Sequence, residues 1–201
     1  MHLKEHQYDV PFLACKGRQM NTFRIKSDIE TVYVKEDYFK KNSHLVKILD
    51  PLDYEKQSRR CYLFLKVEYE GNNLLVPLKS KVEPIKKYGR VGHSVPSSDK
   101  PEAGLEYRKI LILNDEEYLE KPEFCKIPVS QQHILNAEYD KIRAEVKAYV
   151  DGYVKAAIKN RIDREPKFRE SSLINFNEEL KIEQKKNLKK LQQKSKQSIT
   201  V

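Results

Sequence analysis

The segment from Arg59 to Val82 constrains the fold most strongly, because its residue pattern is that of a β-hairpin. Aromatic and β-branched residues, which favour strands, occupy its first half at Tyr62, Phe64, Val67 and Tyr69. The polar run 70–73 contains glycine and asparagine, which tolerate the positive φ of tight turns. The apolar run 74–76 begins the return strand. Pro77 is expected to end its regular pairing, because proline has no N–H to donate.

The outer ends of this hairpin carry a group of cations. Arg59 and Arg60 open the first strand, and Lys79, Ser80 and Lys81 follow the second. Antiparallel pairing brings these ends together, so the sequence predicts a cluster of cationic side chains around one hydroxyl group. Phosphate is the natural ligand of such a cluster. The alternative interpretation of residues 79–81 is a polar strand end without a ligand.

The overall charge agrees with a polyanionic partner. The chain has 201 residues, with 39 Lys and Arg against 30 Asp and Glu, and a formal net charge of +9. This length suits one domain of roughly 100–200 residues. The charge favours nucleic acid or an anionic membrane surface as the partner.

Cysteine usage and hydropathy point to the cytoplasm. The cysteines are odd in number and widely spaced, which indicates free thiols in a reducing compartment: Cys15, Cys61 and Cys125. No apolar run approaches the roughly 20 residues of a membrane span. The first ten residues, MHLKEHQYDV, lack the apolar core of a signal peptide.

The rest of the pattern predicts mixed α and β structure. Residues 1–20 are interpreted as an N-terminal extension, residues 21–180 as the folded domain and residues 181–201 as a Lys-rich helix or tail. Short strands are expected near Phe23 and Ile25, at 31–34 and at 110–113. Helices are expected at 36–49 with a possible break at Asn42-Ser43, at 115–120 after an Asn114 cap, at 130–160 after a Ser130 cap, and from Glu178 onward.

Residues 82–104 show no periodicity and are predicted to form a long loop, a kind of segment that is usually functional or disordered. Basic residues alternate there with an aromatic residue, at Lys86, Lys87, Tyr88, Arg90 and His93. Cations bind phosphates and a ring can stack on a base, so this set, together with Lys109, is predicted to bind single-stranded RNA. The alternative is a mobile, solvated loop.

Several chemistries find no support in the sequence. The histidines do not pair with cysteines or carboxylates at zinc-site spacing, and there is no glycine-rich phosphate loop and no nucleophile elbow. What remains is phosphate chemistry without a metal or cofactor. RNA cleavage needs little more, because the substrate supplies its own 2′-hydroxyl as the nucleophile. The protein must align it and neutralise the charge that develops on phosphorus.

A resemblance adds to this interpretation. The pattern of Arg60, Gly71 and Pro77-Leu78-Lys79-Ser80, followed by Gly104–Lys109 and an apolar strand, resembles the toxins of type III toxin–antitoxin systems, the ToxN/AbiQ superfamily, and most of all its TenpN branch. That superfamily has a proline-leucine-(Thr/Lys/Arg)-Ser motif at a strand end and a catalytic Lys or Arg at the start of the preceding strand. The segment Ser171–Leu180 resembles the closing segment of these toxins. The resemblance covers about residues 21–180.

The resemblance implies a set of site residues. It implies catalytic roles for Arg60, Lys79 and Ser80, which match the motif positions. Tyr54 is the nearest upstream tyrosine, slightly out of register with the tyrosine of the family. Lys81 corresponds to the second lysine of the family but is displaced by one residue.

The resemblance also implies a fold and an activity. The implied fold is α+β: a strongly twisted antiparallel sheet or partial barrel with flanking helices, similar to the Kid/MazF-like ribonucleases. The implied activity is a sequence-selective, metal-independent endoribonuclease that leaves a 2′,3′-cyclic phosphate and a 5′-hydroxyl. The implied partners are target mRNA and a tandem-repeat pseudoknot RNA antitoxin. The toxin processes this RNA, assembles with it into hetero-oligomers and acts in phage defence by abortive infection.

Two other functions remain open from the sequence. A non-catalytic basic RNA-binding protein needs the same cations but no serine in a pocket. The second alternative is a toxin of similar fold that a protein antitoxin inhibits. Toxicity of the chain expressed alone separates the enzyme from the binding protein, and a repetitive non-coding array upstream of the gene argues for an RNA antitoxin.

Overall fold

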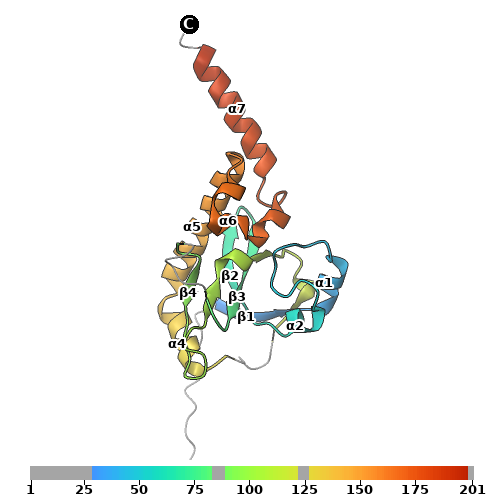
Figure 1. Ribbon diagram of the computed structural model, residues 1–201, viewed down its shortest axis with the longest axis vertical. Coiled ribbons are helices and arrows are strands. Elements are labelled where there is room, and N and C mark those ends of the chain that lie inside the picture. The colour runs from blue at the N-terminus through green and yellow to red at the C-terminus, as the bar shows by residue number, and fades with distance from the viewer. Residues whose placement is uncertain (1–28, 83–88, 122–126, 199–201) are drawn as a thin grey trace, which may run out of the picture.

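The structure is a computed structural model that describes residues 29–82, 89–121 and 127–198. These residues form an antiparallel sheet with helices packed around it, which confirms the predicted α+β class (Figure 1). The sheet is not closed into a barrel by the described strands. The predicted extension 1–20 and the predicted strand near Phe23 and Ile25 lie outside the described residues.

The predicted hairpin forms the centre of the sheet. Strand β2 (Tyr62–Tyr69) pairs antiparallel with β3 (Asn72–Lys79), with Tyr62 opposite Pro77 and Tyr69 opposite Asn72. Glu70 and Gly71 form the turn with φ values of 56° and 83°. Positive φ at both turn residues matches the right-handed twist of the two strands, so the local sequence specifies this turn.

Short strands extend the hairpin on both sides. Strand β1 (Ile29–Val34) pairs with β2 and with β7 (Leu119–Glu120). On the other side β3 pairs with β6 (Leu111–Ile112) near its start and with β5 (Gly104–Glu106) near its end. Strand β4 (Gly92–Ser94) pairs with β5 and lies inside the segment that was predicted to be a long loop.

Pro77 does not end the regular pairing of its strand, so that prediction is wrong. The N–H of Leu78 donates at 3.0 Å to the carbonyl of Cys61, the residue that directly precedes β2. Successive residues of a strand direct their N–H groups to opposite edges, so the nitrogen of Pro77 faces the other edge. There β6 pairs with Leu74 and Leu75, and β5 with Leu78 and Lys79. Pro77 lies between these partners, where no donor is required.

The helices lie around this sheet, except that α7 (Ile182–Ser198) extends beyond it (Figure 1). They are α1 (Glu36–Lys41), α2 (Tyr54–Ser58), α4 (Val129–Ala137), α5 (Tyr139–Ile158), α6 (Pro166–Arg169) and α7. Single 3₁₀ turns are η1 (Tyr107–Lys109), η2 (Glu116–Tyr118), η3 (Ile162–Arg164) and η4 (Ser172–Phe176). The predicted apolar stripe of α5 is confirmed, because its members are buried in the core: Ile142, Val146, Tyr149, Tyr153 and Ala157.

Four predicted helices differ in their bounds. The helix expected from Glu178 begins at Ile182. The helix from Glu36 ends at Lys41, at the predicted Asn42 break. The expected 130–160 helix is divided at Glu138 and begins after Pro128 rather than Ser130. The expected 115–120 helix is wrong: Asp115 caps a 3₁₀ turn that leads into β7, and Asn114 instead accepts from the N–H of Asn73 at 2.9 Å. No helix of the described part is long and apolar enough to cross a membrane.

Candidate functional site

A cavity of about 580 Å³ lies at the outer end of the hairpin. One wall comes from residues 59–61, just before β2, and from the end of β3, and the other wall from residues 97–103 and 127–131. The cavity lining includes Arg59, Arg60, Lys79 and Ser80. The prediction that antiparallel pairing brings these cations and this serine together is therefore confirmed.

Arg60 is held against the cavity by Asp50. The two side chains form an ion pair and are only 17% and 21% exposed, and Lys56 donates to the same carboxylate at 2.7 Å. Burial favours the protonated form of Asp50, but the hydrogen bonds from Lys56 and Arg60 outweigh it and hold its pKa below the ordinary value. The Nε of Arg60 is buried without a hydrogen-bond partner in the described part of the chain. A buried donor without a partner is uncommon in native proteins.

The loop before α2 fixes the position of this ion pair. Asp50 adopts a left-handed backbone with φ of 47°, a conformation that aspartate tolerates better than most residues. The fully buried Gln57 donates to the carbonyls of Leu49 and Asp50 at 2.9 and 2.8 Å. Asp53 caps α2 by accepting from the N–H of Lys56 at 2.9 Å. These bonds place Asp50 and Lys56 on the same side as Arg60.

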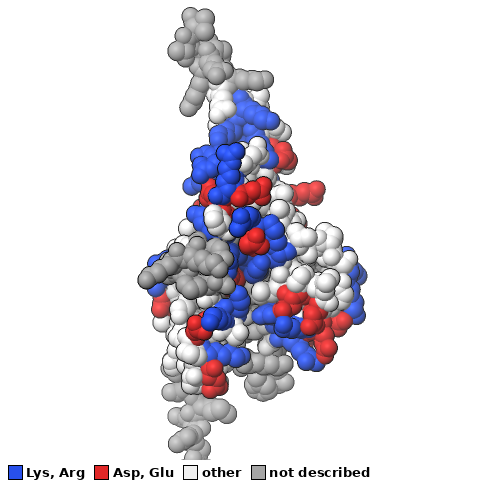
Figure 2. Space-filling model, viewed as in Figure 1, with Lys and Arg blue, Asp and Glu red and all other residues white. Residues whose placement is uncertain are grey.

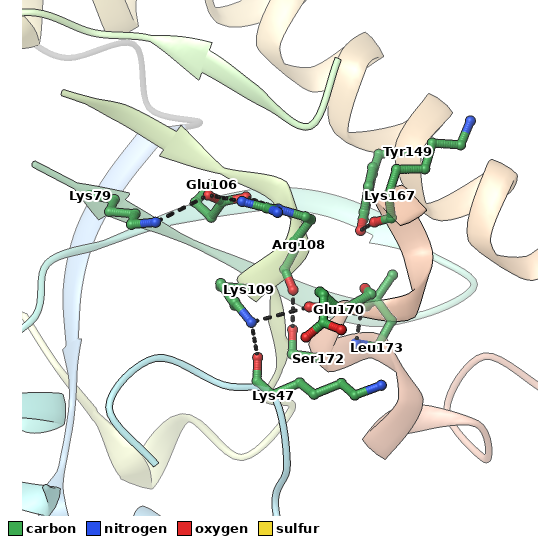
Figure 3. A network of polar contacts seen from close by, with 11 residues as sticks. Lys47, Lys79, Glu106, Arg108, Lys109, Tyr149, Lys167, Glu170, Ser172 and Leu173 are labelled. Carbon is green, nitrogen blue, oxygen red and sulfur yellow. Dashed lines mark hydrogen bonds and ion pairs between the residues drawn. The ribbon is translucent and has the colours of Figure 1, made fainter. Parts of the chain in front are cut away.

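Lys79 is positioned by a buried ion cluster. Its ammonium group lies 3.6 Å from the carboxylate of Glu106, which is fully buried on the neighbouring strand β5. Arg108 holds the same carboxylate through two hydrogen bonds of 2.8 and 2.9 Å. Figure 3 shows Lys79 and Arg108 on either side of Glu106. Ser80 follows directly after β3, is exposed, and lines the cavity.

The opposite wall was not predicted from the sequence. It contains Ser97 and Lys100, which close a turn through two backbone hydrogen bonds of 3.1 and 3.2 Å, and Asp99 between them. Gln131 of α4 is buried and donates to the carbonyl of Val95 at 2.6 Å, which holds this turn against the helix. Tyr33 of β1 also lines the cavity. These residues are distant in sequence from the hairpin, so only long-range packing brings them to it.

Three other predicted site residues are either exposed and paired elsewhere or lie outside the cavity lining. Arg59 lines the cavity but is exposed and paired with Glu55. Lys81 lies outside the lining, and its ammonium group is 3.0 Å from the exposed Glu102. Tyr54 begins α2 and packs against the edge of the core, also outside the lining.

Arg90 and His93 belong to a separate cluster around Glu145, a residue of α5. His93 is buried, with Nδ1 3.0 Å from a carboxylate oxygen of Glu145, and Arg90 pairs with the other oxygen of that group. Tyr107 donates to Glu145 at 2.9 Å. Burial works against ionisation of Glu145, but the bonds from His93, Tyr107 and Arg90 outweigh it and lower its pKa. These two predicted RNA-binding residues are therefore occupied by contacts within the protein.

The ammonium group of Lys109 is also engaged in hydrogen bonds within the protein. It donates to the carbonyls of Lys47 and Glu170 at 2.6 and 3.1 Å (Figure 3). Burial, and then the nearby charge of Arg108, lower the pKa of Lys109. The remaining predicted RNA-binding residues lie outside the described residues: Lys86, Lys87 and Tyr88.

Comparisons with known proteins give one partial structural similarity. No protein-family model matches the chain, and no curated protein sequence is similar to it. A solved structure from work on bacterial type III toxin–antitoxin systems, in which a toxin is selectively inhibited by a non-coding RNA pseudoknot, is similar with a TM-score of 0.47 and 15% identity. The similarity covers 61% of this chain and 77% of that chain.

Proposed function

We propose that this chain is the toxin of a type III toxin–antitoxin system, a metal-independent endoribonuclease. The observation that carries the proposal is the grouping of Arg60, Lys79 and Ser80 on one wall of the cavity. These are the positions at which the sequence matches the catalytic motif of the ToxN/AbiQ superfamily. The open antiparallel sheet is compatible with a Kid/MazF-like fold, which forms part of the proposal.

The side chains suit cleavage by the 2′-hydroxyl of the substrate. Arg60 and Lys79 place two positive charges where the phosphorane develops negative charge, and preorganised charges of this kind stabilise a transition state. The Ser80 hydroxyl donates to a non-bridging phosphate oxygen and does not attack. The 2′-hydroxyl loses its proton to solvent as its oxygen bonds to phosphorus, and the bond to the 5′-oxygen breaks as that oxygen takes up a proton from solvent. The products are a 2′,3′-cyclic phosphate and a 5′-hydroxyl.

Asp50 and Glu106 position the two cations. Each carboxylate holds its cation from the side and also binds a second basic group, Lys56 or Arg108. A positioned charge loses little conformational entropy when the substrate binds, so orientation can contribute several kcal/mol to rate acceleration. We assign the catalytic roles to Arg60, Lys79 and Ser80. Lys81 and Tyr54 are outside this proposed set because they do not line the cavity.

The biological role follows from the same proposal. The chain acts in the cytoplasm on target mRNA and on its own repeat RNA, and a pseudoknot RNA antitoxin inhibits it in a hetero-oligomeric assembly. Release of the toxin during phage infection stops growth, which gives phage defence by abortive infection. The surplus of 39 basic over 30 acidic residues supports an RNA partner.

The test uses the purified full-length chain and a single-stranded RNA of mixed sequence. Wild type should cleave it in excess EDTA and leave cyclic phosphate ends, whereas Ser80→Ala should lose cleavage by about 10²-fold or more, as loss of an oxyanion donor does elsewhere. Ser94→Ala is the matched control, because Ser94 is exposed on β4 and outside the cavity. Cleavage that stops in EDTA and returns with magnesium would overturn the metal-independent mechanism.

One observation favours a second candidate, a non-catalytic RNA-binding protein. Arg60 and Lys79 are already paired with carboxylates, which reduces the net positive charge of the cavity. Growth arrest on expression of the chain alone separates the two functions. Arrest by wild type but not by Ser80→Ala supports the enzyme, and no arrest with wild type supports the binding protein.

A further inference from the structure

Helix α7 extends away from the rest of the molecule. Figure 1 shows it continuing beyond the sheet and the other helices, in red towards the C-terminus. Its start is anchored, because Leu180 and Ile182 are buried in the core. Lys185 fixes the first turn by pairing with Glu70 of the hairpin turn at 2.7 Å and by donating to the carbonyl of Leu180 at 3.0 Å.

The charge of α7 is out of proportion to its length. Its 17 residues contain six lysines and one glutamate, a formal charge of +5 within a chain whose total is +9. Figure 2 shows Lys and Arg side chains gathered over this projecting part of the molecule. Lys189 and Lys190 form no ion pair with any residue that the structure describes. Uncompensated charge on a projecting helix indicates an anionic partner.

A second cavity lies along this helix. It has a volume of about 320 Å³ and lies between one face of α7 and the end of α5, at Ile158 and at Asn160 just after it. Lys186, Lys189 and Lys190 line it together with Glu183, whose carboxylate pairs with Lys186 at 2.8 Å. The helix rises about 1.5 Å per residue, so Lys186 and Lys190 are about 6 Å apart along its axis. This groove therefore presents three cations at a spacing that successive phosphate groups can meet, and Lys189 and Lys190 are the two that form no ion pair within the described part of the chain.

We propose that α7 is a second RNA-binding element, which holds the sugar-phosphate backbone at a distance from the proposed active site. The inference rests on the proposed function in taking RNA as the ligand. It goes beyond that function because it assigns a contact surface outside the catalytic cavity: Lys186, Lys189 and Lys190 with the adjacent end of α5.

The alternative partners fit α7 less well. A membrane surface requires a broad apolar face, but the exposed large apolar residues of the described helix are only Leu188 and Leu191. A second copy of this chain would bring another +5 helix against the first, which charge repulsion opposes. RNA offers the complementary charge without requiring apolar contact.

The hairpin sets the distance between the two elements. The turn at Glu70 contacts α7, whereas Ser80 lines the catalytic cavity at the other end of β3. Seven steps of about 3.3 Å from Asn72 to Lys79 separate these ends by roughly 23 Å. A nucleic-acid strand in a helix advances about 3.4 Å per nucleotide, so one RNA must supply at least about seven nucleotides to reach both.

RNA length therefore provides a test. In the Ser80→Ala background, which prevents cleavage, binding of a labelled 4-nucleotide RNA and a labelled 20-nucleotide RNA is measured from low to high salt. The pair Lys189→Ala and Lys190→Ala should weaken binding of the long RNA by about tenfold and flatten its log–log salt slope by about 1.4. The short RNA should bind as before, because it fills only the catalytic cavity.

A matched control removes the same charge from another helix. Lys147→Ala with Lys155→Ala on α5 also takes two exposed lysines away, and should leave both affinities and both slopes unchanged. An equal loss in the control shows that overall charge alone matters and overturns the proposal. Equal weakening of the short and long RNAs by the Lys189→Ala and Lys190→Ala pair also overturns it. A third contrary result is that this pair abolishes binding to anionic phosphatidylserine vesicles and leaves RNA binding unchanged.

The failures of the two proposals are distinguishable. Cleavage by wild type with no effect of the α7 lysines on the long RNA overturns the role of α7 and leaves the endoribonuclease. Length-dependent binding through α7 without any cleavage by wild type overturns the endoribonuclease and leaves the role of α7.

Discussion

The carboxylate of Glu106, which is fully buried on β5, lies 3.6 Å from the ammonium group of Lys79 at the end of β3. The contact is possible because β3 and β5 pair antiparallel, with Leu78 opposite Leu105 and Lys79 opposite Gly104. Arg108 compensates the buried charge from the other side. Sheet pairing thus connects a core ion pair to a side chain of the proposed active site.

The first prediction concerns the stability of this connection. Glu106→Gln should lower the free energy of unfolding by about 3–5 kcal/mol, because it leaves the buried guanidinium of Arg108 without its counter-charge. Urea unfolding followed by circular dichroism measures the change. Glu102→Gln is the control: its partner Lys81 and Glu102 itself are exposed, so the expected change is below about 1 kcal/mol. Equal stabilities of the two variants would contradict the role of the buried pair.

The second prediction separates two lysines in one segment. Lys79→Ala should reduce RNA cleavage by about 10²-fold or more, because it removes a charge that faces the proposed phosphorane. Lys81→Ala should change cleavage less than about threefold, because Lys81 lies outside the cavity and its exposed ion pair contributes little. Initial rates on one RNA substrate decide the question. Inactivity of Lys81→Ala in a folded protein would return Lys81 to the proposed catalytic set.

The third prediction concerns Asp50 as a positioning residue. Asp50→Asn keeps the shape of the side chain and suits the positive φ at this position, but it removes the charge that orients Arg60. We expect kcat to fall about tenfold or more, because a misplaced charge stabilises the transition state less. KM should stay the same or decrease, since a negative charge beside the cavity is removed. A rise in KM with kcat unchanged would instead indicate a role in substrate binding alone.

The fourth prediction uses the lowered pKa of Glu145. Its folded pKa lies below the ordinary value of 4.5, so the carboxylate stabilises the fold above that pH and the contribution is lost as the pH falls through the folded pKa. Glu145→Gln, whose amide keeps an acceptor for Arg90 and Tyr107, should therefore lose less stability than wild type on acidification below pH 4.5. Thermal unfolding across this range measures the difference. Identical acid profiles would show that this cluster does not contribute to acid unfolding.

Local sequence was sufficient to predict the hairpin and the α5 stripe. A two-residue turn with positive φ and an apolar period of three or four residues are properties of neighbouring residues, so they can be recognised without the fold. The grouping of Arg60, Lys79 and Ser80 followed from the hairpin, because antiparallel pairing leaves no other place for its ends. The continued pairing at Pro77 could not be predicted, because it depends on two short strands that leave a gap opposite its nitrogen.

The sequence alone determined that Arg60, Lys79 and Ser80 lie together at the proposed active site, whereas tertiary structure decided which of the basic residues remain available to a ligand. His93, Arg90 and Lys109 look like RNA-binding residues in the sequence, but Glu145 and the backbone carbonyls of Lys47 and Glu170 already occupy them. Those partners are between 52 and 62 residues away along the chain. Whether a charge is free or paired depends on contacts of this range, which only packing of the whole domain determines.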